Sequence, residues 1–211
     1  MTTFIQQLYK SRKNVLDILE SAHSYDISDY SGFSLSEVDA MSNNLQLDML
    51  LTHQIINGEK KEGPRTYIKY LVGTLNQAVI NQFIEDLYIH TNTLGKDDCL
   101  YIIMTSEPND SVIAHLNYLY IHDERFIVVQ NIKRLQFNIL EHDLVPKVDI
   151  LSNQEVENMK LKYNIVSLKD LPEISRYDAQ ATAICLRPGQ ICKFTRNSPT
   201  SMTTEYFRLC V

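Results

Sequence analysis

The chain of 211 residues has few of the features that mark membrane, secreted or strongly DNA-binding proteins. It contains no apolar run of about 18 residues and no signal-peptide pattern, so we expect neither a membrane span nor a secretory leader. Its four cysteines form no Cys-x-x-Cys pair. That arrangement favours reduced thiols in a soluble, intracellular protein and provides no ligand cluster for zinc.

Basic residues are also scarce. The formal net charge is −6. All of it lies in residues 1–140, because residues 141–211 carry equal numbers of acidic and basic side chains. Broad binding to DNA needs many phosphate contacts from Lys and Arg, so we expect any contact with nucleic acid to be small and local.

Patterns that would support catalysis are weak. The sequence has no glycine-rich phosphate loop, and no two of its histidines have metal-ligand spacing on a helix. His142 lies between two acidic residues and could shuttle a proton, but a structural role at a hinge is the preferred interpretation. We therefore predict no catalytic residue, no metal and no cofactor.

One enzyme hypothesis remains open, a Mg-dependent nuclease. Such enzymes place a carboxylate and a Glu-x-Lys group on neighbouring strands to hold Mg²⁺ and position water. Asp48 and the segment Glu59-Lys60-Lys61 have the required residue types. Glu59 directly follows an Asn-Gly turn signal, where a side chain is poorly fixed, so a solvated charged hairpin is the favoured interpretation.

Residues 1–140 alternate between helical and strand patterns, which predicts an α/β layer. A Ser34-x-x-Glu37 capping box predicts the start of one helix. The uninterrupted apolar run at 99–105 is typical of a strand buried on both faces. Periodicity further predicts helices at 4–21, 75–90 and 111–119 and strands at 45–51, 67–71 and 126–130.

Residues 141–211 predict a small α+β domain. Val148 to Leu151 is apolar enough for a short strand, and Ser152-x-x-Glu155 is a capping box for a helix that ends near Tyr163. Strands are expected at 191–196 and 204–211, joined by a loop at 197–203.

A tight turn is expected just before these two strands. In Arg187-Pro188-Gly189-Gln190, proline presets φ at the second position and glycine accepts positive φ at the third, as a type II turn requires. The final strand is expected to be paired in a sheet or docked on a partner.

The same residues carry a resemblance to a known family. In chain order the matching blocks are His142-x-Leu144-Val145-Pro146, Lys162-Tyr163, Leu171-Pro172-x-Ile174, Gly189-Gln190, Lys193 and Arg208-Leu209. They are similar to the assembly domain of subunit 5 of eukaryotic-type DNA-directed RNA polymerases, which large DNA viruses also encode and of which archaea have a short counterpart. Residues 1–140 resemble the same family less closely.

The resemblance implies two domains with different roles. Residues 141–211 are expected to form an α+β assembly domain with a mixed sheet that binds the largest polymerase subunit. Residues 1–140 are expected to form a three-layer, nuclease-like jaw domain beside downstream duplex DNA. The implied interface residues are His142, Leu144, Val145, Pro146, Leu171, Pro172, Gly189, Gln190, Lys193 and Arg208.

A possible DNA contact follows from the resemblance as well. Pro108, Asn109 and Ser111 occupy the loop at which family members approach the duplex. Ser111 is the expected N-cap of the next helix, and a helix N-terminus offers backbone N–H groups to a phosphate. Glu107 and Asp110 oppose such a contact by their charge.

Taken with the charge balance, these patterns predict a non-catalytic subunit of a multisubunit DNA-dependent RNA polymerase that acts in transcription. It would contact downstream duplex DNA weakly and no membrane. It would work in the nucleus if it is cellular, or in a virion or cytoplasmic viral factory if a large DNA virus encodes it. The alternatives are a free-standing nuclease-like enzyme and an adaptor that binds transcription factors without touching DNA.

Overall fold

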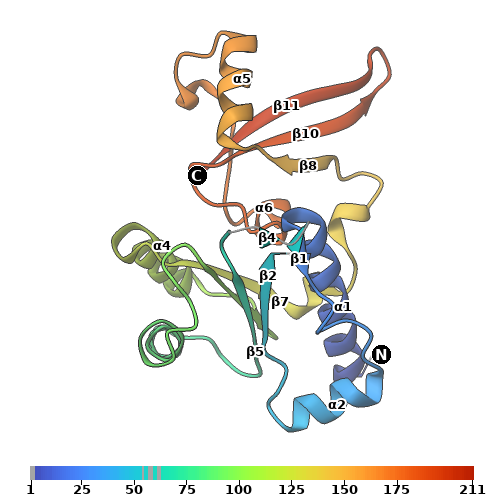
Figure 1. The fold of residues 1–211 in the computed structure, drawn as a ribbon, viewed down its shortest axis with the longest axis vertical. Coiled ribbons are helices and arrows are strands. Elements are labelled where there is room, and N and C mark those ends of the chain that lie inside the picture. Colours follow the sequence, from blue (N-terminus) through green and yellow to red (C-terminus); the bar gives the residue numbers. More distant parts are fainter. Residues whose placement is uncertain (1–2, 54, 57–58, 61–62) are drawn as a thin grey trace. The chain divides into compact units, whose positions relative to one another are not determined.

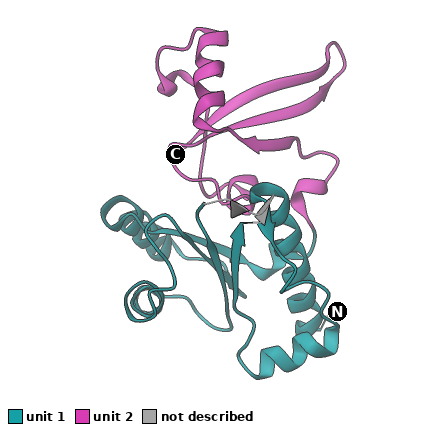
Figure 2. Ribbon diagram, in the orientation of Figure 1, with its two compact units in different colours: residues 1–137 teal, residues 138–211 magenta. Residues whose placement is uncertain are grey.

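A computed structural model of the chain describes residues 3–53, 55–56, 59–60 and 63–211. The chain divides into two compact units, residues 1–137 and residues 138–211 (Figure 2). Within the described ranges, no helix is both long and apolar enough to cross a membrane.

The first unit contains a mixed five-stranded sheet. Its strands pair in the order β1 (Tyr25–Asp26), β2 (Met49–His53), β5 (Thr66–Leu71), β6 (Cys99–Met104) and β7 (Phe126–Asn131). β5, β6 and β7 are parallel, whereas β2 runs antiparallel to both of its neighbours. Met104 pairs with Leu71 on one side and with Asn131 on the other. The carboxyl ends of the three parallel strands therefore meet at one edge of the sheet.

Helices of the first unit lie on both sides of this sheet, with α1 and α2 on one side and α4 on the other (Figure 1). A separate two-stranded hairpin joins β3 (Ile55–Ile56) to β4 (Glu59–Lys60). The helical elements are α1 (Phe4–His23), α2 (Leu35–Asn43), α3 (Gln77–Ile84), the π-helical η1 (Glu85–His90), α4 (Asp110–Asp123) and the 3₁₀ turn η2 (Ile132–Leu135). The likeness to a nuclease layout and the jaw assignment stay predictions.

Strand β6 runs through the centre of the first unit. All six of its residues are buried, which confirms the expectation of a strand covered on both faces. Leu100, Ile102 and Met104 belong to one apolar cluster together with Ile80 of α3 and Leu116 of α4. Successive side chains of a strand point to opposite faces, so this cluster fills the side of the sheet that α3 and α4 cover.

The first helix forms as its spacing predicts. Thr3 caps α1, because its hydroxyl accepts a hydrogen bond from the backbone N–H of Gln6 while the Gln6 side chain accepts one from the backbone N–H of Thr3. Leu8, Val15 and Leu19 are buried on one face. The helix therefore packs on its own unit.

One predicted strand begins later than its pattern indicated. The alternation from Leu45 suggested a strand over 45–51, but β2 starts at Met49. Leu45 is 90% exposed and has a φ of 57°, and its N–H bonds to the carbonyl of Ser42. The residue therefore closes the end of α2, and a left-handed backbone cannot continue into a strand.

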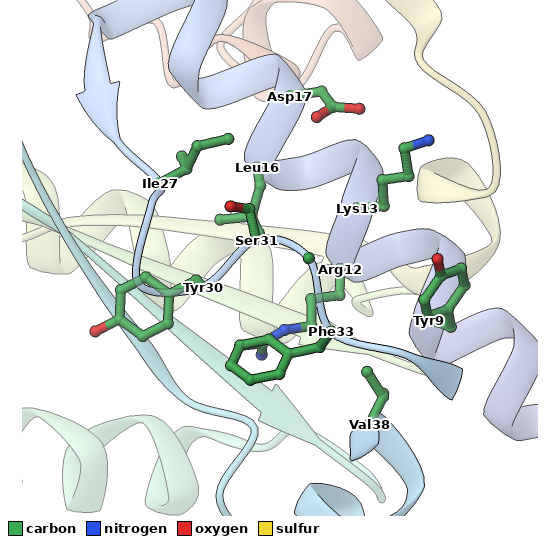
Figure 3. Close-up of a pocket in the computed structure, with 11 residues that line it drawn as sticks. Tyr9, Arg12, Lys13, Leu16, Asp17, Ile27, Tyr30, Ser31, Phe33 and Val38 are labelled. Carbon is green, nitrogen blue, oxygen red and sulfur yellow. The ribbon is translucent and has the colours of Figure 1, made fainter. Parts of the chain in front are cut away.

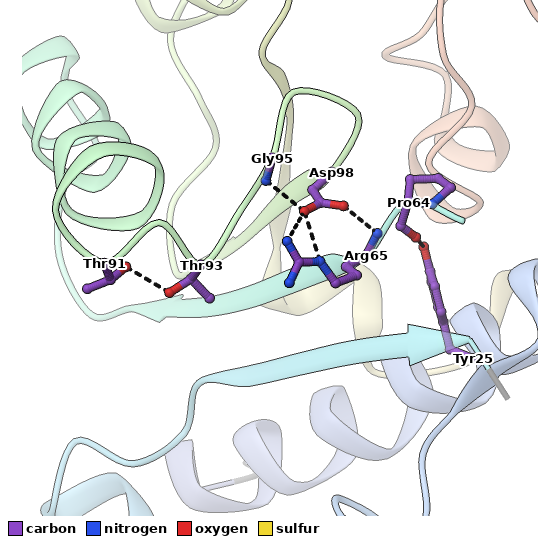
Figure 4. Close-up of polar contacts among 7 residues, drawn as sticks. All are labelled: Tyr25, Pro64, Arg65, Thr91, Thr93, Gly95 and Asp98. Atoms are coloured by element: carbon purple, nitrogen blue, oxygen red, sulfur yellow. Dashed lines mark hydrogen bonds and ion pairs between the residues drawn. The ribbon is translucent and has the colours of Figure 1, made fainter. Parts of the chain in front are cut away.

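A buried carboxylate fixes the amino end of the parallel strands. Asp98 accepts hydrogen bonds from the backbone N–H of Arg65 at 2.7 Å, from the Arg65 guanidinium at 2.7 and 3.0 Å, and from the backbone N–H of Gly95 at 2.7 Å (Figure 4). Close by, Tyr25 donates its hydroxyl to the carbonyl of Pro64. The bonds to Asp98 tie the segment before β5 to the loop before β6, and the bond from Tyr25 ties the same segment to β1.

The second unit is a four-stranded mixed sheet, which confirms that part of the fold prediction. Its strands pair in the order β8 (Lys147–Ile150), β10 (Ile191–Ser198), β11 (Met202–Cys210) and β9 (Glu173–Ile174). Only β9 is parallel to its neighbour. The helical elements are η3 (Ile139–Glu141), α5 (Asn153–Tyr163), η4 (Leu168–Asp170) and α6 (Ala179–Ala183).

The predicted capping box and turn of the second unit are both present. Ser152 accepts from the backbone N–H of Glu155, and the Glu155 carboxylate accepts from the backbone N–H of Ser152 at 2.8 Å. Gly189 has a φ of 89°, and Gln190 N–H bonds to the carbonyl of Arg187 at 3.0 Å. Each feature begins or ends an element at the expected residue.

The hairpin between β10 and β11 is longer than predicted. Asn197 pairs with Thr203 and Ser198 with Met202, so the expected loop at 197–203 shrinks to residues 199–201. The hydrogen bonds between paired strands are made by the backbone, so polar side chains at the end of a hairpin do not prevent them. The final strand is paired at its end, because Val211 N–H bonds to the carbonyl of Ile174 at 2.9 Å.

Candidate subunit interface and nucleic-acid contact

The segment that opens the second unit is a well-defined turn. His142 accepts a hydrogen bond at Nδ1 from the backbone N–H of Leu144, and its carbonyl accepts one from Val145 N–H at 2.8 Å. Gln180 donates its side-chain amide to the carbonyl of Pro146 at 3.1 Å. His142 therefore shapes this turn, as the structural interpretation expected, and Leu144 is left 87% exposed.

This turn forms one wall of a groove of about 910 Å³. The other wall comes from the far half of the β10–β11 hairpin. The lining residues are Leu140, Glu141, His142, Asp143, Leu144, Val145, Pro146, Lys147, Thr195, Arg196, Asn197, Thr203 and Tyr206. Four predicted interface residues, 142 and 144–146, are thus brought together with hairpin residues that the sequence did not single out.

Tyr206 is the residue of this groove that sequence reasoning missed. Its ring stacks on Phe194 with centroids 5.0 Å apart. The guanidinium groups of Arg196 and Arg208 lie 5.7 and 5.9 Å from its centroid. Tyrosine and arginine are the residues that most often dominate binding energy at protein interfaces. The signal in the sequence that could have indicated this aromatic and basic surface is the alternation of Phe194 with Arg196 along one strand.

A second group of predicted interface residues gathers at the end of β9 and β11. The carbonyl of Pro172 accepts from Leu209 N–H, and Arg208 donates Nη1 to the carbonyl of Glu173 at 3.1 Å. Gly189 N–H bonds to the carbonyl of Cys210, whose own N–H bonds to the carbonyl of Gln190. Leu171, Pro172, Gly189, Gln190 and Arg208 are therefore neighbours in space.

Lys193 lies apart from both groups. It pairs with Phe207 and Asp149 across the sheet, whereas Arg208 pairs with its neighbour Cys192. Adjacent residues of a strand face opposite sides, so Lys193 and Arg208 are on different faces. The ammonium group of Lys193 lies 3.9 Å from the carboxylates of Asp149 and Glu205. All ten predicted interface residues keep accessible surface.

Two of the three cysteines in the second unit have poorly reactive thiols. Cys192 and Cys210 are buried. Burial raises the pKa of each thiol to about 11, with the neighbouring Cys210 adding to the shift at Cys192. The thiolate is the nucleophile and the metal ligand, so both sulfurs are neutral and inert at neutral pH.

The loop predicted to approach DNA connects β6 to α4. Asn109, and not Ser111, is the N-cap: its side chain accepts from Val112 N–H at 2.9 Å. Ser111 lies within the first turn and donates its hydroxyl to Asn109 Oδ1. The prediction of Ser111 as cap is wrong because Asn is an equally good cap residue and stands two positions earlier. Pro108 immediately precedes it.

Two cations lie beside this loop that the sequence analysis did not connect with it. Because Met104 and Asn131 are paired, the segments after β6 and β7 leave the sheet side by side. The second segment carries Lys133 and Arg134, both exposed. Arg134 Nη2 lies 3.1 Å from Glu107 in the loop. Only the parallel pairing of the strands reveals this neighbourhood.

Of the residues in the nuclease hypothesis, Asp48 is the one whose side chain the structure describes. Asp48 accepts from Lys69 Nζ at 2.7 Å and from the Tyr67 hydroxyl at 3.1 Å. Lys61 and the side chains of Glu59 and Lys60 lie outside the described residues. Over the part of the chain whose placement is described, no group of three or more His, Cys, Asp or Glu could hold a metal ion.

The second unit thus defines the class of small α+β domains built on a four-stranded mixed sheet. The family described as RNA polymerase Rpb5, C-terminal domain, matches residues 137–210. The chain belongs to the Rpb5 family of RNA polymerase subunits, whose archaeal members are named Rpo5.

Three archaeal relatives illustrate the match, and each is named DNA-directed RNA polymerase subunit Rpo5. The Thermococcus kodakarensis protein is 40% identical over 76 residues, 36% of this chain and 92% of the relative. The Archaeoglobus fulgidus protein is 38% identical over 77 residues, 36% of this chain and 100% of the relative. The Methanosarcina mazei protein is 33% identical over 76 residues, 36% of this chain and 96% of the relative. The predicted family and its role in transcription are thereby confirmed.

Proposed function

We propose that the chain is a non-catalytic subunit of a DNA-directed RNA polymerase whose second unit binds the largest subunit of the complex. The observation that carries this proposal is a coincidence of boundaries. The family match spans residues 137–210, and the compact unit spans residues 138–211. The shared sequence therefore corresponds to one structural module, and the chain would act wherever its polymerase acts, in a nucleus, a virion or a viral factory.

The surface of the second unit supports a docking role. Leu144 projects at the mouth of the groove with 87% of its surface exposed. Burying such a side chain against a partner contributes about 1.5–3 kcal/mol. Tyr206 and its two arginines provide an aromatic and cationic anchor beside it. The backbone around Gly189 and Gln190 is already hydrogen-bonded, so docking there would proceed through side chains and turn surfaces.

The first unit is proposed as a jaw module beside downstream duplex DNA. The loop with Pro108, Asn109 and Ser111 lies at the carboxyl edge of the parallel strands, the edge at which open α/β sheets usually bind ligands. Lys133 and Arg134 add positive charge there. The acidic balance of residues 1–140 leaves room for few phosphate contacts, so this contact would be weak.

The interface is tested with full-length chain co-expressed with the largest polymerase subunit. Leu144→Asp places an unpaired charge in the proposed interface and should reduce capture of that subunit at least about tenfold. Val166→Asp is a matched control, because Val166 is 93% exposed and outside the candidate set. Equal capture by the two variants would contradict the proposed surface.

Fragments test the division of roles. Residues 138–211 should co-purify with the largest subunit, and residues 1–137 should not. Deleting residues 207–211 should abolish capture, since it removes the end of β11 that pairs with β9 and leaves backbone groups of β9 and β10 unmatched. Capture by residues 1–137 alone would reverse the assignment, whereas degradation of DNA by the purified chain with Mg²⁺ would favour the nuclease alternative.

A further inference from the structure

The first unit has a pocket of about 290 Å³ between α1 and the loop that leads to α2 (Figure 3). Its lining is mixed, with apolar side chains around two cations and one carboxylate. The lining residues are Tyr9, Arg12, Lys13, Leu16, Asp17, Ile27, Tyr30, Ser31, Gly32, Phe33 and Val38. None of these residues belongs to the proposed polymerase or DNA contacts, so the pocket needs its own explanation.

Arg12 is the unusual member of this pocket. It is only 4% exposed, and Figure 3 shows its side chain extending from α1 toward the ring of Phe33. The guanidinium carbon lies 5.5 Å from the centre of that ring and 5.9 Å from the ring of Tyr30. The two aromatic side chains thus hold the guanidinium in a defined place.

The polar groups of Arg12 are only partly satisfied. Nη1 donates to the carbonyl of Leu47 at 3.0 Å. Nε is buried and has no hydrogen-bond partner, and no described carboxylate lies within ion-pair distance of the guanidinium. Buried donors are nearly always paired in native proteins. Arg12 therefore lines the pocket with an N–H donor for which the described part of the chain supplies no acceptor.

The charge of Arg12 points to the same conclusion. Burial lowers the pKa of the guanidinium, while Tyr70 and Tyr30 act in the opposite direction. An arginine nevertheless stays protonated at neutral pH. A buried cation without a counter-ion destabilises the folded chain, and a bound anion would remove that cost.

We propose that this pocket binds the carboxylate of an acidic segment of a partner protein, with Arg12 as its principal ligand. A carboxylate is planar and matches the donor geometry of a guanidinium. Leu16, Phe33 and Val38 would cover the methylene groups that carry the carboxylate. Lys13 is exposed at the rim and would attract acidic neighbours of the inserted side chain.

Pocket size and surroundings favour a peptide side chain over a free cofactor. Pockets for small-molecule ligands usually measure about 300–1,000 Å³, and this one, at about 290 Å³, is at the small end of that range. Asp17 also lines the pocket and repels any anion there, so that together with Arg12 and Lys13 the lining carries a net charge of +1. The site therefore suits one carboxylate at a time, as a single Glu or Asp side chain provides.

The proposal is tested on full-length, ¹⁵N-labelled chain by following the side-chain Nε–H resonance of Arg12. The probe is the capped peptide acetyl-Ser-Leu-Glu-Leu-Ser-amide, compared with the same peptide carrying Gln in place of Glu. The acidic peptide should shift this resonance saturably and bind at least about tenfold more tightly than the neutral one, as expected for a charged hydrogen bond. Equal binding of both peptides, or no binding up to about 5 mM, would overturn the proposal.

Variants and a second ligand separate the remaining outcomes. Arg12→Met keeps the apolar stem and should reduce affinity about tenfold, whereas Lys10→Gln, an exposed change on α1 outside the pocket, should leave it unchanged. Lys13→Gln keeps the test usable if the Arg12 variant unfolds, and should weaken binding about twofold. If 3-phenylpropionate shifts the resonance and the peptide does not, the site takes a free acid and the peptide assignment is wrong.

Discussion

The two units of this chain reach stability in different ways. In the first, β6 is buried along its whole length and receives apolar side chains from helices on the sheet face. In the second, β8 alternates between exposed and half-buried residues, and Leu144, Leu161 and Val166 are each more than 80% exposed. A domain of this smaller size buries a lower fraction of its surface.

The difference lies in the cores of the two units. Singly exposed apolar side chains are normal on the surface of a protein, and only contiguous apolar patches mark binding sites. The first unit satisfies its core internally, and its unusual feature is an unpaired buried cation. Large exposed apolar side chains occur in both units, for example Leu45 and Ile121 in the first and Leu144 and Val166 in the second, so the two units differ in how completely their strands are buried.

The largest loss of stability is expected from a substitution that creates a cavity in the first unit. Ile102→Ala removes a fully buried side chain from the centre of β6 and should lower the free energy of unfolding by about 2–5 kcal/mol. Val72→Ala is the control, since Val72 is 68% exposed and its truncation should cost less than about 0.5 kcal/mol.

Hydrogen exchange followed by mass spectrometry would localise this effect. Peptides from residues 99–131 should lose protection in the Ile102 variant, while peptides from residues 191–210 should keep theirs, because the two units have separate cores. An equal loss of protection in both regions would show that the two units unfold together and do not have separate cores.

The next largest loss of stability is expected from a substitution at the turn of the second unit. Gly189→Val forces a β-branched residue to adopt a φ of 89° and should destabilise this unit by about 1–3 kcal/mol. No atom lies within 4 Å of an added Cβ, so backbone strain alone is responsible. Gly189→Asn, which tolerates positive φ better, should cost clearly less. Equal melting temperatures for the Val variant and the parent would contradict this reasoning.

The sequence predicted best those features that depend on neighbouring residues. The capping boxes at Ser34 and Ser152 and the turn at Gly189 are local, and each appears where its pattern placed it. Leu45 was misjudged because alternation cannot distinguish a strand from the end of a helix. Ser111 was misjudged because two good cap residues stand in the same loop.

Features that depend on strand pairing could not be predicted. Nothing in the order of residues places Arg134 beside Glu107, or Tyr206 beside the turn at His142. The unpaired Nε of Arg12 also required three segments to fold together. The ten interface residues stay a prediction, although the structure divides them into two clusters and the separate Lys193.

A smaller effect on stability is expected from the buried carboxylate of the first unit. Burial opposes ionisation of Asp98, but hydrogen bonds from Arg65 and Gly95 outweigh it and hold its pKa below the usual value. A carboxyl group with a lowered folded-state pKa stabilises the fold above its unfolded pKa of about 3.9. That contribution is lost as the pH falls through the folded pKa.

Asp98→Asn should therefore lower the free energy of unfolding at pH 7 by on the order of 1 kcal/mol. The difference from the parent chain should shrink as the pH falls below about 4. Denaturant titrations between pH 7 and pH 2 measure this, with the exposed Asp97→Asn as control. A difference that stays constant with pH would show that the carboxylate charge is not the cause.

The smallest effect is expected at the proposed DNA contact. Lys133→Gln in assembled polymerase should reduce the slope of log affinity against log salt by about one unit, with little change in the subunit's incorporation. Glu107→Gln should act in the opposite direction, because it releases Arg134 from its 3.1 Å ion pair. Lys96→Gln is the charge-matched control, since Lys96 lies in the loop before β6 at the other end of the strands. An equal change from the Lys96 and Lys133 variants would mean that net charge, and not this edge of the sheet, governs the interaction with DNA.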